Sequence, residues 1–236
     1  MSLVRERITI KELTDDQRDQ MFLLMKTYYE NTVRDIFDHD LNEKDCVLIF
    51  FEQSTGKIAG FSTQMIMPVE FNGNTYIILF SGDTIIAKEH WGSMILSVCF
   101  GELMMDLIDK YKDKKVYWLL ISKGIRTYKY LPTFFIDFYP TVNKETPPEI
   151  QEFMHHLGEL KFKELYDRTK GIVKAPSGGQ FLKGEFQPEP HPNKNHEVFF
   201  AKANPGYFKG DELLCLAELS MDNINPFIKR ILLSHK

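Results

Sequence analysis

The residues best suited to chemistry lie in one short stretch, FSGDTIIAKEHWGSMIL, at residues 80–96. An apolar run breaks at Ser81-Gly82-Asp83, resumes for three residues, turns through a glycine and continues as a helix-like run from Ser93. A strand, a glycine-containing turn and a helix start together can hold phosphate groups on backbone N–H donors. The stretch therefore predicts a site for a phosphate-bearing ligand. Asp83 is either a buried base there or part of a β-bulge whose side chains cap local N–H groups.

Two side chains in this stretch and two in a later segment are candidates for further roles. Histidine is suited to proton transfer near neutral pH, so His90 either has that role or is a solvated turn residue. Trp91 could stack on an adenine ring or anchor the following helix. Tyr128 and Tyr130, in the segment RTYKYLPTFF, are either acids or packing residues of a short helix.

The elements that must position these residues alternate between strands and helices. Glycine-containing turns at residues 54–56 and 72–74 predict three consecutive antiparallel strands. Thr14 followed by Gln17 predicts a helix start with a capping box. Periodicity and turn residues predict strands at 6–13, 46–52, 57–71, 75–80, 116–122 and 138–142, and helices at 14–29, 33–37, 93–111, within 123–135 and at 147–160.

The C-terminal part of the chain is less regular. Residues 171–197 are rich in glycine, proline and polar residues and predict a long irregular loop. We expect a last strand at 198–204 and a C-terminal helix. The segment NPGYFKGDEL, at 204–213, is either a lid over a pocket or a tight turn into a helix capped by Asp211. We expect a single domain over residues 1–236, with a core at about 6–142 and an extension at 143–236.

Composition excludes several classes of function. The net charge is −4 without a basic stripe, which argues against a nucleic-acid partner. Cys46, Cys99 and Cys215 are scattered, as expected for reduced thiols in the cytoplasm. We expect no signal peptide, and the run at 93–108 is too short and too charged to span a membrane. DHDLNEKD resembles a calcium loop, but Glu43 replaces the glycine and Ile49 the last ligand, so we expect no metal.

The order of these elements resembles the GNAT fold of acyl-CoA-dependent N-acyltransferases, over residues 6–142. The resemblance implies an α/β (α+β) fold with a mixed, mostly antiparallel central sheet flanked by helices. It also implies central strands that splay into a V-shaped cleft, with an oxyanion-binding N–H near residues 85–87. The motif carrying it is TIIAKEHWGSMIL, matched to the strand and turn that wrap the coenzyme A pyrophosphate.

The resemblance assigns residues to two sites. The cofactor-binding residues that it implies are Thr84, Ile86, Glu89, His90, Trp91, Gly92, Ser93 and Met94. In either register of the turn at most one small residue is retained, because Met94 occupies a slot in which the family has a small residue. In the second site, Thr133 falls in the slot of the tyrosine that acts as acid, which leaves Tyr128 or Tyr130 for that role beside Asp83.

The implied function is N-acyl transfer from an acyl thioester to an amine. The donor would be acyl-CoA, acetyl-CoA or an acyl carrier protein, and the acceptor a small-molecule amine or amino acid, as in the acyl-homoserine-lactone synthases that share this fold. A homodimer is compatible with this function. The alternative is a non-catalytic GNAT-like module that binds a lipid, an acyl chain or a protein partner.

Overall fold

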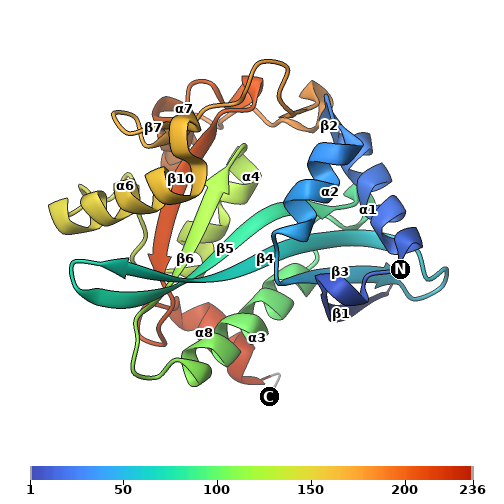
Figure 1. Ribbon diagram of the computed structural model, residues 1–236, viewed down its shortest axis with the longest axis horizontal. Coiled ribbons are helices and arrows are strands. Elements are labelled where there is room, and N and C mark those ends of the chain that lie inside the picture. The colour runs from blue at the N-terminus through green and yellow to red at the C-terminus, as the bar shows by residue number, and fades with distance from the viewer. Residues whose placement is uncertain (1, 235–236) are drawn as a thin grey trace.

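The chain folds around one mixed sheet with helices on both faces (Figure 1). The computed structural model describes residues 2–234. Its elements are β1 (Leu3–Thr9), α1 (Asp15–Tyr28), β2 (Tyr29–Glu30), α2 (Arg34–Asn42), β3 (Cys46–Glu52), β4 (Ile58–Phe71), β5 (Asn74–Ile86), α3 (Ile95–Lys110), β6 (Val116–Ser122), α4 (Ile125–Tyr128), α5 (Tyr130–Phe134), α6 (Pro148–Phe162), β7 (Tyr166–Asp167), β8 (Ile172–Val173), β9 (Phe181–Leu182), α7 (Asn195–Ala203), β10 (Glu212–Glu218) and α8 (Pro226–Ser234).

Eight strands form the main sheet in the order β1-β3-β4-β5-β6-β10-β8-β7. Every neighbouring pair is antiparallel except β5 and β6, which are parallel. β2 and β9 form a separate two-stranded sheet. The prediction of a mixed, mostly antiparallel sheet is therefore confirmed, and so is that of three consecutive antiparallel strands, β3 to β5.

Local sequence signals define the start of α1. The Thr14 hydroxyl accepts a hydrogen bond from the Gln17 backbone N–H at 3.2 Å, and the Gln17 side chain accepts one from the Thr14 N–H at 2.9 Å. This is the predicted capping box, which satisfies two N–H groups that the first helical turn leaves unpaired. The helix then buries Met21 and Met25 against the sheet.

The apolar core is divided between the two faces of the sheet (Figure 1). On one face, α3, α5 and α8 cover a large cluster that includes Leu79 and Trp118. On the other face, α1 and α2 cover one cluster around Phe61, and α6 covers a second around Leu119. The face that carries α1, α2 and α6 therefore has two apolar halves with a space between them.

The helix α3 is the longest in the chain, at 16 residues. It buries an apolar stripe against the sheet and keeps Glu102 and Asp106 exposed, where they pair with Arg5 and Arg7 of β1. None of the helices within residues 2–234 combines the length and the apolarity that a membrane span requires.

The C-terminal part differs from the prediction in two elements. Residues 198–204, predicted as a strand, belong mainly to α7, which buries Phe200. The last strand is β10, whose continuous apolar run ELLCLAE lies between β6 and β8 and is buried on both faces. Asp211 precedes this strand and caps no helix. Its carboxylate accepts hydrogen bonds from the Lys174 ammonium at 2.6 Å and from the Ala175 N–H at 3.0 Å.

Gly60 is required by the close approach of β4 and β5. A Cβ atom at this position would lie 2.7 Å from the Ile85 carbonyl oxygen and 2.6 Å from Cδ1 of Ile86. Because the first of these contacts is with backbone, a side chain at this position can be accommodated only if the strands move apart.

We therefore expect Gly60→Ala to reduce the free energy of unfolding by about 1–3 kcal/mol. The matched control is Gly184→Ala, since a Cβ atom at Gly184 meets nothing within 4 Å. It should change the stability by less than about 0.5 kcal/mol. Urea unfolding of both variants checks the prediction, and equal stabilities would contradict it.

Candidate functional site

The site begins where the parallel strands β5 and β6 separate. Their pairing runs from Ile77 opposite Val116 to Ser81 opposite Leu120 and ends there. Beyond that point β5 continues beside β4, and β6 continues beside β10. Ligands commonly bind outside the carboxyl ends of parallel strands, at a point where two neighbours diverge. This separation of the parallel pair is the splayed, GNAT-like arrangement that the sequence resemblance implies.

A β-bulge directs Asp83 to one face of this opening. Gly82 and Asp83 together stand opposite the single residue Thr63 of β4, because Ser62 pairs with Thr84 and Gln64 with Ser81. A bulge shifts the alternation of side chains by one residue. A Cβ atom on Gly82 would lie 2.7 Å from the Thr63 hydroxyl and 2.8 Å from Cε of Lys44, so a larger residue here would require these side chains to move. The β-bulge that the sequence left open is therefore present, and it aims Asp83 into a cavity.

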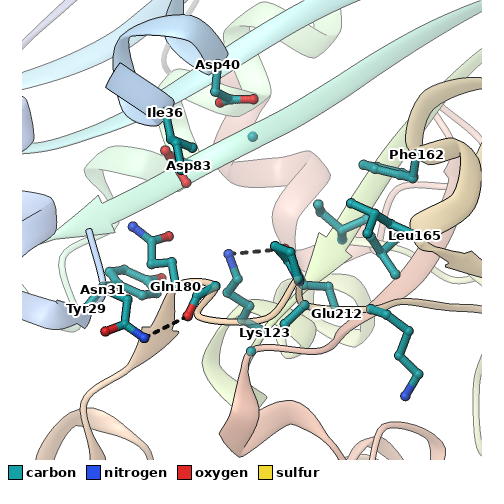
Figure 2. A pocket seen from close by; sticks show the side chains of 18 of the residues that line it. Tyr29, Asn31, Ile36, Asp40, Asp83, Lys123, Phe162, Leu165, Gln180 and Glu212 are labelled. Carbon is teal, nitrogen blue, oxygen red and sulfur yellow. Dashed lines mark hydrogen bonds and ion pairs between the residues drawn. The ribbon is translucent and has the colours of Figure 1, made fainter. Parts of the chain in front are cut away.

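The cavity has a volume of about 570 Å³ and lies between α2 and the segment that follows α6. Figure 2 shows Asp83 and Ile36 of α2 on one side of the cavity, with Phe162 and Leu165 on the other. The cavity thus fills the space between the two apolar halves of this face of the sheet. A volume of this size suits a small organic ligand.

Asp83 is the acidic group at the floor of the cavity. Within residues 2–234, its carboxylate makes no hydrogen bond and no ion pair (Figure 2). Desolvation, together with the nearby carboxylates of Asp40 and Glu212, raises its pKa to about 6 against the opposing effects of Lys123 and Lys44. A carboxyl group that titrates near neutral pH in a cleft is a candidate general base.

Lys123 and Glu212 form an ion pair beside Asp83. Lys123 follows β6 and Glu212 begins β10, and their side chains are 3.1 Å apart. Desolvation lowers the pKa of Lys123, but the carboxylates of Glu212 and Asp83 outweigh it and raise that pKa above its usual value. The Lys123 ammonium lies 5.9 Å from the centre of the Tyr29 ring, and desolvation raises the pKa of Tyr29 to about 12.

The roof of the cavity comes from the predicted loop at 171–197. β9 pairs with β2 at Tyr29 and Glu30, and the Asn31 side chain donates a hydrogen bond to the Gly179 carbonyl at 3.2 Å. The other end of the roof is held by Asp211 through Lys174. Gly210, from the 204–213 segment, also lines the cavity. That segment is therefore a turn that anchors the roof.

Tyr128 and Tyr130 lie on the other side of the sheet. Tyr128 is fully buried in the cluster under α3, and its hydroxyl donates a hydrogen bond to the Pro140 carbonyl at 2.9 Å. Tyr130 packs against the same cluster. Neither lines the cavity that contains Asp83. The two tyrosines therefore have packing roles in this structure, and they share no cleft with Asp83.

The predicted phosphate turn lies between β5 and α3. Thr84 lines the cavity, and the Ile86 side chain packs against the cluster under α3. The Ala87 N–H donates to the Ala59 carbonyl at 2.7 Å, so it is not free to bind an oxyanion. His90 is buried, with its Nε2 atom 3.5 Å from the Glu52 carboxylate. His90 is therefore packed against the end of β3 and is not the solvated turn residue that the sequence allowed.

The first turn of α3 retains some capacity to bind an anion. The Leu96 and Ser97 N–H groups have no hydrogen-bond partner among residues 2–234. Gly92 has a φ of 90° with open space around it, and the Ser93 hydroxyl accepts from the Ile95 N–H at 3.3 Å. These donors would suit a phosphate group.

Two side chains of the turn disfavour binding of a phosphate group. Met94 is 44% exposed where the resemblance implies a small residue, and Glu89 adds negative charge near the free N–H groups. The turn therefore fits a coenzyme A diphosphate only in part.

Trp91 connects the end of β5 to α4, across the opening where β5 and β6 separate. Its indole N–H donates to the Ile86 carbonyl at 2.8 Å, and the Arg126 guanidinium of α4 lies 3.7 Å from its ring centre. Arg126 in turn donates to the Phe186 carbonyl at 2.8 Å. We call Trp91, Arg126 and Phe186 the Trp91 clamp. The clamp ties the end of β5 to the helix after β6 and to the loop from the C-terminal extension.

Three residues of the cavity were not among the sequence candidates. Lys123 comes directly after the buried run VYWLLIS, and a charged residue at the end of a buried strand is a usable signal. Glu212 offered no such signal because the strand that it begins was not predicted. Tyr29 stood at the end of a predicted helix, where nothing in its sequence context indicates a cavity. No cluster that could hold a metal ion is present in the described part of the chain.

No protein-family model matches the sequence, and no curated protein matches it. Among solved structures, the chain is similar to a probable N-acyltransferase from Enterococcus faecalis V583, with 15% identity and a TM-score of 0.43 over 57% of this chain and 33% of that one. It is similar to glucosamine-6-phosphate N-acetyltransferase from Arabidopsis thaliana, with 18% identity and a TM-score of 0.39 over 55% and 88%. It is also similar to Saccharomyces cerevisiae N-myristoyltransferase with bound myristoyl-CoA, with 12% identity and a TM-score of 0.41 over 52% and 30%. The chain thus matches about a third of the length of the Enterococcus protein.

The raised pKa of Asp83 predicts how stability depends on pH. Its usual value of 3.8 rises to about 6 in the folded protein. The folded state therefore bears the cost of a desolvated carboxylate above pH 6, and this cost disappears as the pH falls to 3.8. We expect Asp83→Asn to be more stable than the parent at pH 8, on the order of 1–3 kcal/mol, with no difference at pH 4.

Urea unfolding at both pH values tests this dependence. Asp113→Asn, at an exposed turn after α3, is the matched control and should show no such difference between the two pH values. A variant at Asp83 that is less stable than the parent at pH 8 would contradict the assignment of an unpaired, desolvated carboxylate.

Proposed function

We propose that this protein transfers an acyl group from a thioester to an amine, with the amine bound in the Asp83 cavity. The observation that carries the proposal is an unpaired carboxylate, with a pKa of about 6, where β5 and β6 separate. Its location agrees with a GNAT-like site, and its titration suits a base at neutral pH.

The chemistry requires that the amine lose a proton before it attacks. An amine in neutral water is mostly an ammonium ion, which lacks the lone pair that must attack the carbonyl carbon. The Asp83 carboxylate would accept that proton and pass it to solvent. Attack forms the C–N bond, and the C–S bond breaks with loss of a thiolate. The nitrogen would give up its second proton to the Asp83 carboxylate, which has by then released the first to solvent, as the amide forms.

Tyr29 would supply the proton that the thiolate takes up. Its phenol faces the same cavity as Asp83, and a pKa of about 12 keeps it protonated at neutral pH. It would regain a proton from solvent, so the overall reaction balances as thioester plus amine giving amide plus thiol. Tyr29 thus takes the role that the resemblance assigned to Tyr128 or Tyr130, which lie on the opposite side of the sheet.

The donor would enter beside the turn before α3. The free N–H groups of Leu96 and Ser97 would receive an anionic group of the carrier, which is coenzyme A or the phosphopantetheine arm of an acyl carrier protein. The Trp91 clamp joins the end of β5 to α4, so we expect the donor to displace Arg126 or Phe186 when it binds.

The Trp91 clamp also supports a second candidate function. A module that binds a ligand in the Asp83 cavity without turnover has no need of a donor route. Closure of the opening by Trp91 and Arg126 suits such a module.

Thermal unfolding with acetyl-CoA, octanoyl-CoA and myristoyl-CoA separates the two candidates. A donor present at about 100 times its dissociation constant stabilises the folded state by about 2.7 kcal/mol. Stabilisation by at least one thioester, followed by thiol release when amines are added, is expected for the enzyme. No stabilisation by any of these thioesters or by an acyl carrier protein thioester would leave the binding module.

We expect Asp83→Asn to lower the rate of acyl transfer by roughly 10²–10⁴-fold. It should also remove the increase in rate that the parent shows as the pH rises through about 6. Tyr29→Phe should lower kcat with little effect on the KM for the amine. Thiol release measured from pH 5 to pH 8 checks both variants. Asp113→Asn is the control, and an unchanged rate for Asp83→Asn would exclude Asp83 as the base.

A further inference from the structure

The half-buried charges around the cavity are paired except at its floor. Lys123 pairs with Glu212, Lys161 with Glu43 and Lys174 with Asp211, at distances of 3.1, 2.8 and 2.6 Å respectively. Lys163 and Glu164, of opposite charge, also line the cavity but are exposed to solvent. Asp40 pairs with Lys44 at 2.7 Å. Asp83 is the half-buried carboxylate without a partner in residues 2–234.

An unpaired charge that is withdrawn from water is costly, and a ligand of opposite charge relieves that cost. The floor of the cavity therefore favours a cation over an anion or a neutral polar group. The four lysines of the lining do not reverse this preference. Three of them each pair with a carboxylate, and the fourth, Lys163, is exposed to water beside Glu164.

The mouth of the cavity is apolar, in contrast to its charged floor. Val33, Ile36 and Leu165 line it and are 50%, 68% and 41% exposed. They come from two separate elements, since Val33 and Ile36 lie at the start of α2 and Leu165 follows α6. Figure 2 shows Ile36 on one side of the cavity and Phe162 and Leu165 on the other. Apolar side chains left in water on two facing walls mark a place where an apolar group can be bound.

We infer that the acceptor is an amphipathic primary amine, with its ammonium group at Asp83 and an apolar body between Ile36 and Leu165. That this amine is the acceptor of an acyl group rests on the proposed function. Binding of the amine in the cavity does not require acyl transfer. The class includes alkylamines and amines with an aromatic or branched apolar body. It excludes fatty acids, whose carboxylate would face Asp83, and small polar amines, which leave the apolar mouth empty.

Binding of n-alkylamines without any thioester tests the inference. Each methylene buried at the mouth should tighten binding by about fourfold, so octylamine should bind on the order of 100-fold more tightly than butylamine. Isothermal titration below the micelle concentration gives both constants. Octanoate and octanol, which have the same chain with a negative or neutral head, should bind at least tenfold more weakly than octylamine.

Two kinds of variant separate the head from the body of the ligand. Asp83→Asn should remove the preference for octylamine over octanol, while Asp113→Asn should keep it. Ile36→Ser and Leu165→Ser should reduce the gain from butylamine to octylamine, and both side chains are exposed enough that the fold should persist. Leu23→Ser, at a side chain that is 60% exposed on α1 and does not line the cavity, is the matched control.

The outcomes keep the two proposals apart. Tight octylamine binding that depends on Asp83, without thiol release from any thioester, would support this inference and count against the transferase. Acyl transfer to short polar amines, without dependence on chain length, would support the transferase and overturn this inference. Equal binding of octylamine and octanoate, or no binding of octylamine, would also overturn it.

Discussion

Four hydrogen bonds cross the sheet where β5 and β6 separate, and the site depends on them. The Trp118 indole N–H donates to the Ser81 hydroxyl at 2.8 Å, and that hydroxyl donates to the Gln64 side chain at 2.7 Å. Gln64 continues the chain to Ser62, which bonds to Thr84. Buried polar groups that are fully satisfied in this way fix one arrangement of the strands around them. The chain ties β6, β5 and β4 together beside the bulge, so the bulge has a fixed position.

The bulge accounts for the chemistry of the cavity. It places Asp83 on the face between the α1–α2 cluster and the α6 cluster, where no side chain fills the space. A carboxylate in such a space loses part of its hydration and gains no partner, which explains its raised pKa. Burial of the two apolar clusters stabilises the fold and offsets the destabilising effect of the unpaired Asp83 carboxylate. The elements around these clusters, α2 and the segment after α6, also carry the exposed apolar residues of the mouth.

The C-terminal extension completes the cavity from above and closes the opening from the side. Its loop pairs with β2 and is held by Asp211, so the roof has fixed contacts at both ends. Phe186, from the same loop, accepts a hydrogen bond from Arg126 in the Trp91 clamp. A single segment therefore contacts both the cavity and the Trp91 clamp.

The sequence by itself determined the parts of the protein that depend on neighbouring residues. The capping box at Thr14 and Gln17, the three strands joined by tight turns and the buried run of β6 follow from local periodicity and turn chemistry. It also located Asp83 at a break in β5, because the glycine beside it interrupts an apolar run. The strand β10 was missed, since the apolar run at 198–204 offered a competing strand and lies in α7 instead.

Only the tertiary structure decided which residues meet. A bulge of one residue reverses the direction of every side chain that follows it, so the sequence could not show that Asp83 faces away from Tyr128 and Tyr130. Nor could it pair Lys123 with Glu212, because that contact depends on β10 lying beside β6. Burial and charge pairing are set by strands that are distant in the chain, and these two quantities determine the chemistry of the cavity.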